Sequence, residues 1–207
     1  MEVKSVVGKI STVLGISLIL GIMLPSIVSA EEGSFSIAPK LIAFFPNSDS
    51  NGLNNYSTGV GIGVDARFNF LAFFALAAEL DYIGASNATG IHYGSTSATV
   101  NGNFSNFAIK IDALLTIPIG IVKLFFGPGV VYNNPSVSVS GGGSSTTLST
   151  SGYGWEIVGG ADFFVAENGA ITAEISFPLS QDVTFSGNSA TVNVGGYELM
   201  AGYRFFF

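Results

Sequence analysis

Residues 107–117 read FAIKIDALLTI, and two kinds of side chain alternate along this stretch. Phe107, Ile109 and Ile111 fall on one side of an extended chain, whereas Lys110 and Asp112 fall on the other. Alternation with a period of two residues is typical of a β-strand whose two faces meet different surroundings. The stretch therefore predicts a strand with one apolar, uncharged face and one face that carries charge.

The same pattern recurs in seven further runs along the chain. We expect strands at about 34–46, 59–68, 74–82, 107–117, 122–132, 155–165, 171–179 and 197–207. Each run is close to the roughly 9–11 residues that a tilted strand needs to cross a bilayer. The pattern therefore favours strands that span a membrane.

Charged residues within these runs all share one phase of the alternation. They are Lys40, Asp65, Arg67, Glu79, Asp81, Lys110, Asp112, Lys123, Glu156, Asp162, Glu174, Glu198 and Arg204. Thirteen of the eighteen charged residues after residue 30 thus face one side, and the opposite side carries none. The uncharged side is too continuous and too aromatic for the core of a soluble sandwich. We predict a charged interior, with eight acids and five bases, and an exterior that contacts lipid.

Composition agrees with a membrane protein built from strands. Charged residues make up 10% of the chain, against about 25% in an ordinary soluble domain. The mean hydropathy is +0.53, yet no apolar run after residue 30 approaches the roughly 20 residues of a spanning helix. The absence of Cys excludes disulfides and thiolate sites, and the seven scattered Lys and Arg residues argue against nucleic-acid binding.

The first thirty residues have the features of a secretory signal. Lys4 and Lys9 form a basic start, residues 10–23 are apolar, and Val28-Ser29-Ala30 supplies small residues before an acidic pair. This arrangement predicts cleavage after Ala30. We therefore expect residues 1–30 to be the signal peptide and residues 31–207 to form the barrel.

Connection lengths predict the topology of the sheet. Lipid offers no partner to backbone N–H and C=O groups, so the sheet must close on itself. The links 69–71, 118–120 and 166–170 are short, whereas 47–57, 84–104, 133–152 and 180–194 are long. Outer-membrane barrels have short periplasmic turns and long outer loops. We expect both ends of the mature chain on the periplasmic side.

Aromatic residues are expected to form a girdle at each membrane interface. The periplasmic girdle is predicted to contain Phe68, Phe70, Phe73, Phe74, Phe163, Phe164 and Phe205–Phe207. The outer girdle is predicted to contain Phe44, Phe45, Tyr82, Phe107, Tyr132, Tyr153, Trp155, Phe177 and Tyr197.

Two of the long links contain their own alternation. A two-residue turn at Gly187-Asn188 would pair Val183 with Val192, and a bulge at Gly195-Gly196 would then reverse the phase. In 133–152, which has no charge, Val137, Val139 and Leu148 alternate. That link is either a solvated loop or a protruding hairpin whose edge pairs with a partner strand.

The chain ends in Tyr203-Arg204-Phe205-Phe206-Phe207. With this ending and the eight strands, residues 31–207 resemble the OmpA/OmpX-type small outer-membrane barrels. The resemblance implies an all-β fold: an eight-stranded antiparallel transmembrane β-barrel with an up-and-down meander. It also implies export to the periplasm and residence in the outer membrane of a Gram-negative bacterium. Tyr203, Phe205 and Phe207 resemble the assembly signal that the barrel-assembly machinery reads. The family has no common catalytic residues.

Three arrangements could carry chemistry. The lumen charges either fill the barrel as a satisfied network or line a narrow cation-preferring path, in which Gly59, Gly61 and Gly63 leave space across from Asp81, Glu79 and Ala77. Asp162 and Glu174 are expected to face each other across the 166–170 turn, with Arg204 or Lys123 as partner. His92 lies near Ser95 and Ser97, as in some lipid-modifying enzymes, but without a nearby acid.

The sequence therefore favours a non-enzymatic outer-membrane protein with a structural or surface-interaction role. The alternative is a narrow channel for small solutes or ions through the lumen. We expect no cofactor, metal or catalytic site and no nucleic-acid partner. Membrane lipid, the assembly machinery and a surface partner that contacts loops 84–104 and 133–152 are the expected partners.

Overall fold

A computed structural model describes residues 33–46, 58–88, 92–93, 96–97, 101–141, 144–179, 182–184, 191–193 and 195–207. The predicted signal peptide and the link 47–57 lie outside these residues. The described residues contain no helix that is long and apolar enough to cross a membrane.

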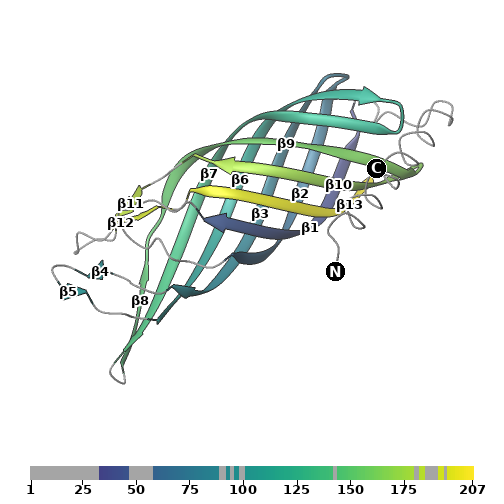
Figure 1. Cartoon of the computed structure of the whole chain (residues 1–207). Helices are drawn as coiled ribbons and strands as arrows, with labels where there is room; N and C mark the ends of the chain where they lie inside the picture. The colour runs from purple at the N-terminus through teal and green to yellow at the C-terminus, as the bar shows by residue number, and fades with distance from the viewer. Residues whose placement is uncertain are drawn as a thin grey trace, which may run out of the picture.

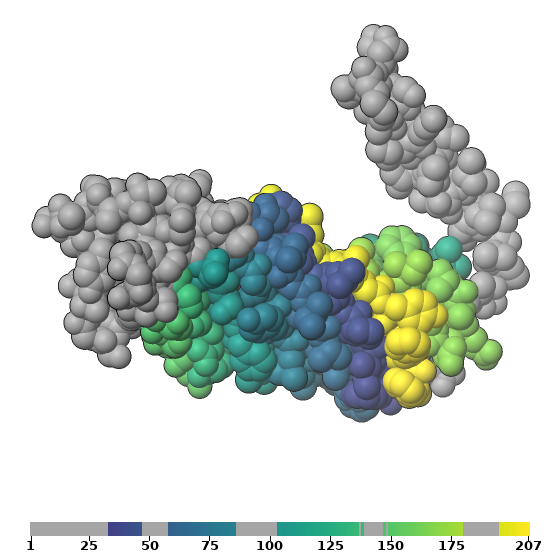
Figure 2. Space-filling view, turned by 90° about the horizontal axis from the view of Figure 1, so that it is seen from below, coloured from purple at the N-terminus to yellow at the C-terminus, as the bar shows by residue number. Residues whose placement is uncertain are grey.

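Eight long strands form a closed antiparallel barrel (Figure 1). They are β1 (Phe35–Pro46), β2 (Gly59–Leu71), β3 (Phe74–Ala88), β6 (Asn101–Ile119), β7 (Val122–Gly141), β9 (Gly152–Ala166), β10 (Gly169–Pro178) and β13 (Gly196–Phe206). Each pairs with the next along the chain, and β1 closes the barrel against β13. Figure 2 shows this closure, with purple β1 beside yellow β13. The predicted meander is confirmed.

The two ends of the barrel differ. At one end, two-residue turns at 72–73, 120–121 and 167–168 join the strands, and β1 begins and β13 ends there. We name this the turn end and the opposite one the loop end. Burial alternates along each strand, and outward side chains such as Leu41 and Val60 are 70% and 71% exposed. The period-two pattern in the sequence therefore separates the lumen from the lipid-facing wall.

Strands at the loop end are longer than the sequence predicts. β3 continues to Ala88, β6 begins at Asn101 and β7 runs to Gly141, and β8 (Ser144–Ser149) pairs with the end of β7. Most of the predicted loop 133–152 is therefore a hairpin that extends beyond the barrel (Figure 1). Val137 pairs with Leu148, as the hairpin interpretation requires. In the link after β3, β4 (His92–Tyr93) pairs with β5 (Thr96–Ser97).

The last hairpin follows the predicted register. Val183 of β11 (Asp182–Thr184) pairs with Val192 of β12 (Thr191–Asn193), which confirms the pairing, while the Gly187-Asn188 turn lies outside the described residues. The predicted bulge is instead a break, because Gly195 is not in a strand and β13 starts only at Gly196. β11 and β12 form a separate small sheet.

A single cysteine tests which end faces outward, because the chain has no Cys of its own. Thr147 in β8 and Asn168 in the turn between β9 and β10 are both exposed, at opposite ends of the molecule. We expect Thr147→Cys to react with a membrane-impermeant maleimide on intact cells, and Asn168→Cys only after permeabilisation. The reverse pattern would contradict the predicted orientation.

Candidate functional site

All thirteen charged residues of the strands lie in the lumen. Each is buried, from 0% exposure for Arg204 to 7% for Glu174. A buried charge is tolerated when an opposite charge and hydrogen bonds compensate for the loss of water. The geometry of the lumen therefore depends on how five bases are distributed among eight acids.

Two arginines hold the cluster nearest the turn end. Arg204 donates two parallel hydrogen bonds to Asp65, at 2.6 and 2.8 Å, and its Nε donates to Asp162 at 3.0 Å. Arg67 lies 3.3 Å from each of the same two carboxylates. Lys123 donates to the amide oxygen of Asn69 at 2.6 Å. Paired hydrogen bonds between a guanidinium and a carboxylate are strong and fix both groups in orientation.

Lys40 occupies the middle of the lumen. Its ammonium bonds to Glu79, and it lies 3.1 Å from Glu174 and 3.6 Å from Asp65. Among the described residues, these three acids form the one group placed closely enough to share a metal ion. Lys40 supplies the positive charge at this point.

Near the loop end, the ammonium of Lys110 lies close to several carboxylates. Lys110 lies 2.5 Å from Glu198, 2.9 Å from Asp81, and 3.6 Å from both Glu79 and Glu156. Asp112 is buried nearby and makes no ion pair within 4.0 Å among the described residues. Negative charge is therefore concentrated in the loop-end half of the lumen, and positive charge in the turn-end half.

An aromatic pair lies near each end of the charged network. Phe164 stacks on Phe206 at 5.0 Å near the turn end, and Phe44 stacks on Phe104 at 6.3 Å near the loop end. The prediction that Phe44, Phe164 and Phe206 belong to the lipid-facing girdles is wrong, since Phe44 and Phe164 are buried and Phe206 stacks on Phe164. Below the Phe44 pair, a cavity leaves only about 10 Å³ for the centre of a water molecule, roughly enough for one water.

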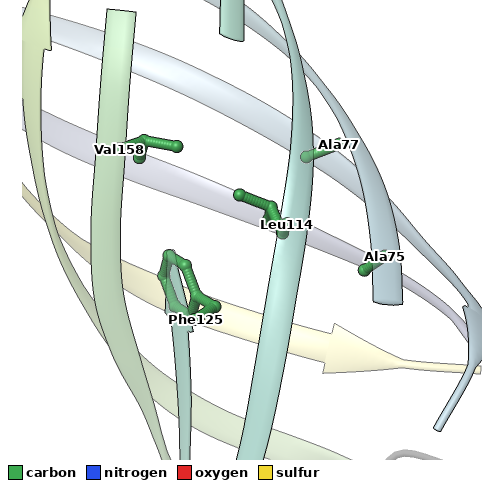
Figure 3. Packing of buried hydrophobic residues seen from close by; sticks show 5 residues of the cluster. All are labelled: Ala75, Ala77, Leu114, Phe125 and Val158. Atoms are coloured by element: carbon green, nitrogen blue, oxygen red, sulfur yellow. The ribbon is translucent and has the colours of Figure 1, made fainter. Parts of the chain in front are cut away.

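An apolar cluster fills one side of the turn-end half. It consists of Ala75, Ala77, Leu114, Phe125 and Val158, whose side chains point into the barrel (Figure 3). The guanidinium of Arg67 lies 4.0 Å from the centre of the Phe125 ring. This cation–π contact joins the apolar cluster to the arginine cluster.

Comparison with known proteins agrees with this geometry. The model of the outer membrane protein beta-barrel domain matches residues 14–205. The chain belongs to this family. Barrel, charged lumen and lipid-facing wall thus place the chain in the bacterial outer membrane, where lipid surrounds it. A search of the curated proteins found no match.

Solved structures of family-like barrels share the fold. OprG from Pseudomonas aeruginosa is 14% identical, with a TM-score of 0.70 over 88% of this chain and 99% of that chain. Neisserial surface protein A is 19% identical, with a TM-score of 0.56 over 85% and 100% of the two chains. Ail of Yersinia pestis is 19% identical, with a TM-score of 0.51 over 84% and 100%. At such identities the likeness concerns the fold alone.

Register separates two predicted neighbours in the lumen of this barrel. Asp162 pairs with Thr172, and Glu174 pairs with Gly160, so the predicted facing carboxylates are not opposite each other. The 167–168 turn contains two residues, and a bulge follows at Gly169. Of the two expected partners, Arg204 contacts Asp162 and Lys123 donates to Asn69 instead.

The glycines of β2 leave less free space than the channel interpretation requires. The predicted pairing of these glycines is wrong: Asp81 faces Gly63 rather than Gly59, Gly61 pairs with Ile83, and Glu79 pairs with Asp65. A Cβ at Gly63 would collide with the Asp81 carboxylate. Gly63 therefore makes room for a longer acid rather than for solvent.

Several lumen residues were not singled out in the sequence. Asn69 and Asn106 are buried and hydrogen-bonded, and Ser176 donates to Glu156. Each lies an even number of residues from the charged residues of its strand, so the two-residue alternation alone would have indicated that it faces the lumen. His92 pairs with Ser97 in the β4–β5 hairpin, and Ser95 lies outside the described residues.

Neutralising Asp112 tests the charge excess near the loop end. We expect Asp112→Asn to raise the free energy of unfolding by about 1–2 kcal/mol, because burying an unpaired carboxyl costs free energy whether it stays charged or takes up a proton, and the neutral amide avoids this cost. Asp162→Asn is the matched control, since Asp162 contacts both Arg204 and Arg67, and it should lower that free energy. Urea titration of the barrel in lipid vesicles measures both, and a similar loss in the two variants would contradict the assignment.

Proposed function

We propose that this family member is a non-enzymatic outer-membrane anchor whose lumen is sealed and whose β7–β8 hairpin makes surface contacts. The observation that carries the proposal is the buried network of ion pairs that lies between two aromatic pairs. Such a network stiffens the barrel and leaves no continuous path for solutes. An eight-stranded barrel is just wide enough for side chains to fill.

Contact with a partner is assigned to the loop end. There β6, β7 and β8 continue beyond the barrel as an uncharged sheet. Two proteins with this fold are the attachment invasion locus protein Ail and Neisserial surface protein A. Their shared fold supports a surface role here as a proposal.

The charge on the exterior of the barrel indicates which class of surface partner it binds. All five Lys and Arg side chains after residue 30 are buried in the lumen. Ail has been solved with the heparin analogue sucrose octasulfate, and sulfate recognition relies on basic side chains. The exterior of this barrel has none, so we propose a neutral or cationic partner rather than a sulfated glycan or a lipid phosphate.

We propose that the chain is exported and assembled in the way that its resemblance to the family implies. Residues 1–30 would be removed as a signal peptide, and the assembly machinery would read Tyr203, Phe205 and Phe207. Deleting Phe207 should reduce the amount of heat-modifiable barrel in the outer membrane, because the terminal aromatic is lost. Phe207→Tyr keeps the aromatic ring and serves as the control. An unchanged yield after the deletion would reject the signal.

Conductance of the refolded barrel in a planar bilayer tests the sealed lumen against the alternative narrow channel. We expect no discrete current steps from wild-type protein whose folding is verified by a heat-dependent gel shift. Cation-selective steps that weaken in Glu79→Gln or Asp81→Asn would favour the channel and overturn the proposal.

A further inference from the structure

The wall of the barrel has a local defect between β6 and β7. The pairing skips Ala113 and Leu114, although Asp112 pairs with Gly129 and Leu115 pairs with Phe126 in one continuous register. In that register Pro128 lies opposite Ala113. Proline has no N–H to donate to the Ala113 carbonyl, and it is rare in central strands for this reason.

The two strands nevertheless stay close at this point. A Cβ on Gly127 would collide with the Ala113 carbonyl oxygen, so this oxygen lies close to the Gly127 backbone. On its other side Pro128 stays paired with Ile157 of β9. The defect is therefore confined to one side of β7 and does not open the barrel.

A groove of about 520 Å³ lies over the defect. Its outward-facing rim comes from five strands and includes Phe70, Phe74, Ala113, Phe126, Pro128 and Ile157. Ala75 and Leu114 face the lumen and so form its floor. Both residues belong to the apolar cluster of Figure 3, so the floor is backed by Ala77, Phe125 and Val158. The groove is thus apolar on its sides and behind its floor.

The position of the groove in the membrane indicates which kind of molecule fills it. The groove starts at Phe70 and Phe74 near the turn end and reaches Pro128 at the middle of the wall. Acyl chains are the solvent along this path, and an empty groove would deprive its lining of dispersion contacts. Its volume falls in the range of small-ligand sites, roughly 300–1,000 Å³.

We propose that this groove binds one acyl chain of a phospholipid from the leaflet at the turn end, seated against Pro128. The groove crosses the strands from β2 to β9, with at most three lining residues on each strand, and a linear, flexible chain can follow this path. The site would make one lipid longer-lived than the rest of the surrounding lipid.

Native mass spectrometry of the barrel, extracted from outer membranes in a mild detergent, tests the site. Wild-type protein should retain one phospholipid. Ala113→Trp places a large side chain in the groove and should lower the retained fraction about tenfold, as expected when a few buried methylene contacts are lost. Ile111→Trp is the control, since it is on the same face of β6 but outside the groove, and it should retain the lipid.

A second variant keeps the test decisive if Ala113→Trp does not assemble. Pro128→Val restores an N–H opposite Ala113, so the ladder should close and the retained lipid should again decrease. A heat-dependent gel shift verifies folding in every case. Equal lipid retention in wild type, Ala113→Trp and Pro128→Val, or no retention by wild type, would overturn the proposal.

Discussion

Replacing Arg204 with methionine should lower the free energy of unfolding by about 3–5 kcal/mol, the cost of leaving buried partners without their counter-charge. Arg204 is fully buried and binds Asp65 through two hydrogen bonds and Asp162 through a third. Methionine preserves much of the side-chain volume, so the loss reports on charge rather than on a cavity. Urea titration of the barrel in lipid vesicles measures the change.

Lys123→Met is the matched control for this experiment. Lys123 is also a buried base, but it donates a hydrogen bond to the neutral Asn69, and no carboxylate lies within 4.0 Å of it among the described residues. We expect a clearly smaller loss than for Arg204→Met. Equal losses in the two variants would show that the arginine cluster has no special role in stability.

Ile111→Arg is expected to destabilise the barrel by about 2–4 kcal/mol, because an arginine on the lipid face near the bilayer centre has no favourable partner. Ile111 is 54% exposed on the outer face of β6, where the surroundings are acyl chains. Refolding titrations in vesicles give the value directly.

Thr147→Arg provides the comparison for the lipid-facing substitution. Thr147 is exposed on β8, in the hairpin beyond the barrel, so an arginine there should change stability by less than about 0.5 kcal/mol. A small effect of Ile111→Arg, similar to that of Thr147→Arg, would contradict the assignment of the inner and outer faces.

Parity along the strands explains why much of this barrel could be predicted from the sequence. Lipid requires an apolar outer face, so Lys110 and Asp112 in a run of apolar residues already indicate which face is inside. The same parity places Phe44 and Phe164 in the lumen, with Lys40 and Asp162. Their position near the ends of the strands predicts a place in the girdles, whereas the two-residue alternation correctly predicts that they face the lumen.

Interactions across the lumen could not be predicted in this way. Which carboxylate meets Arg204 depends on barrel register and on side-chain reach, because Asp65 and Arg204 are 139 residues apart. A one-residue error in a turn displaces every cross-strand partner, as happened for Asp162 and Glu174. The β7–β8 hairpin was hard to recognise because Ser, Thr and Gly suit both loops and hairpins.

Hydrogen exchange of the arginine side chains tests the sealed lumen most directly. The mature chain has two arginines, Arg67 and Arg204, so a nitrogen-15 spectrum of the barrel in nanodiscs contains two Nε signals, which Arg67→Lys assigns. The Nε–H of Arg204 donates to Asp162 at 3.0 Å inside the network. We predict exchange with deuterium about a hundredfold slower than in a free peptide, as for a group that exchanges only by local opening. Exchange of Arg204 at the free-peptide rate would show that water reaches the network and would contradict the sealed lumen.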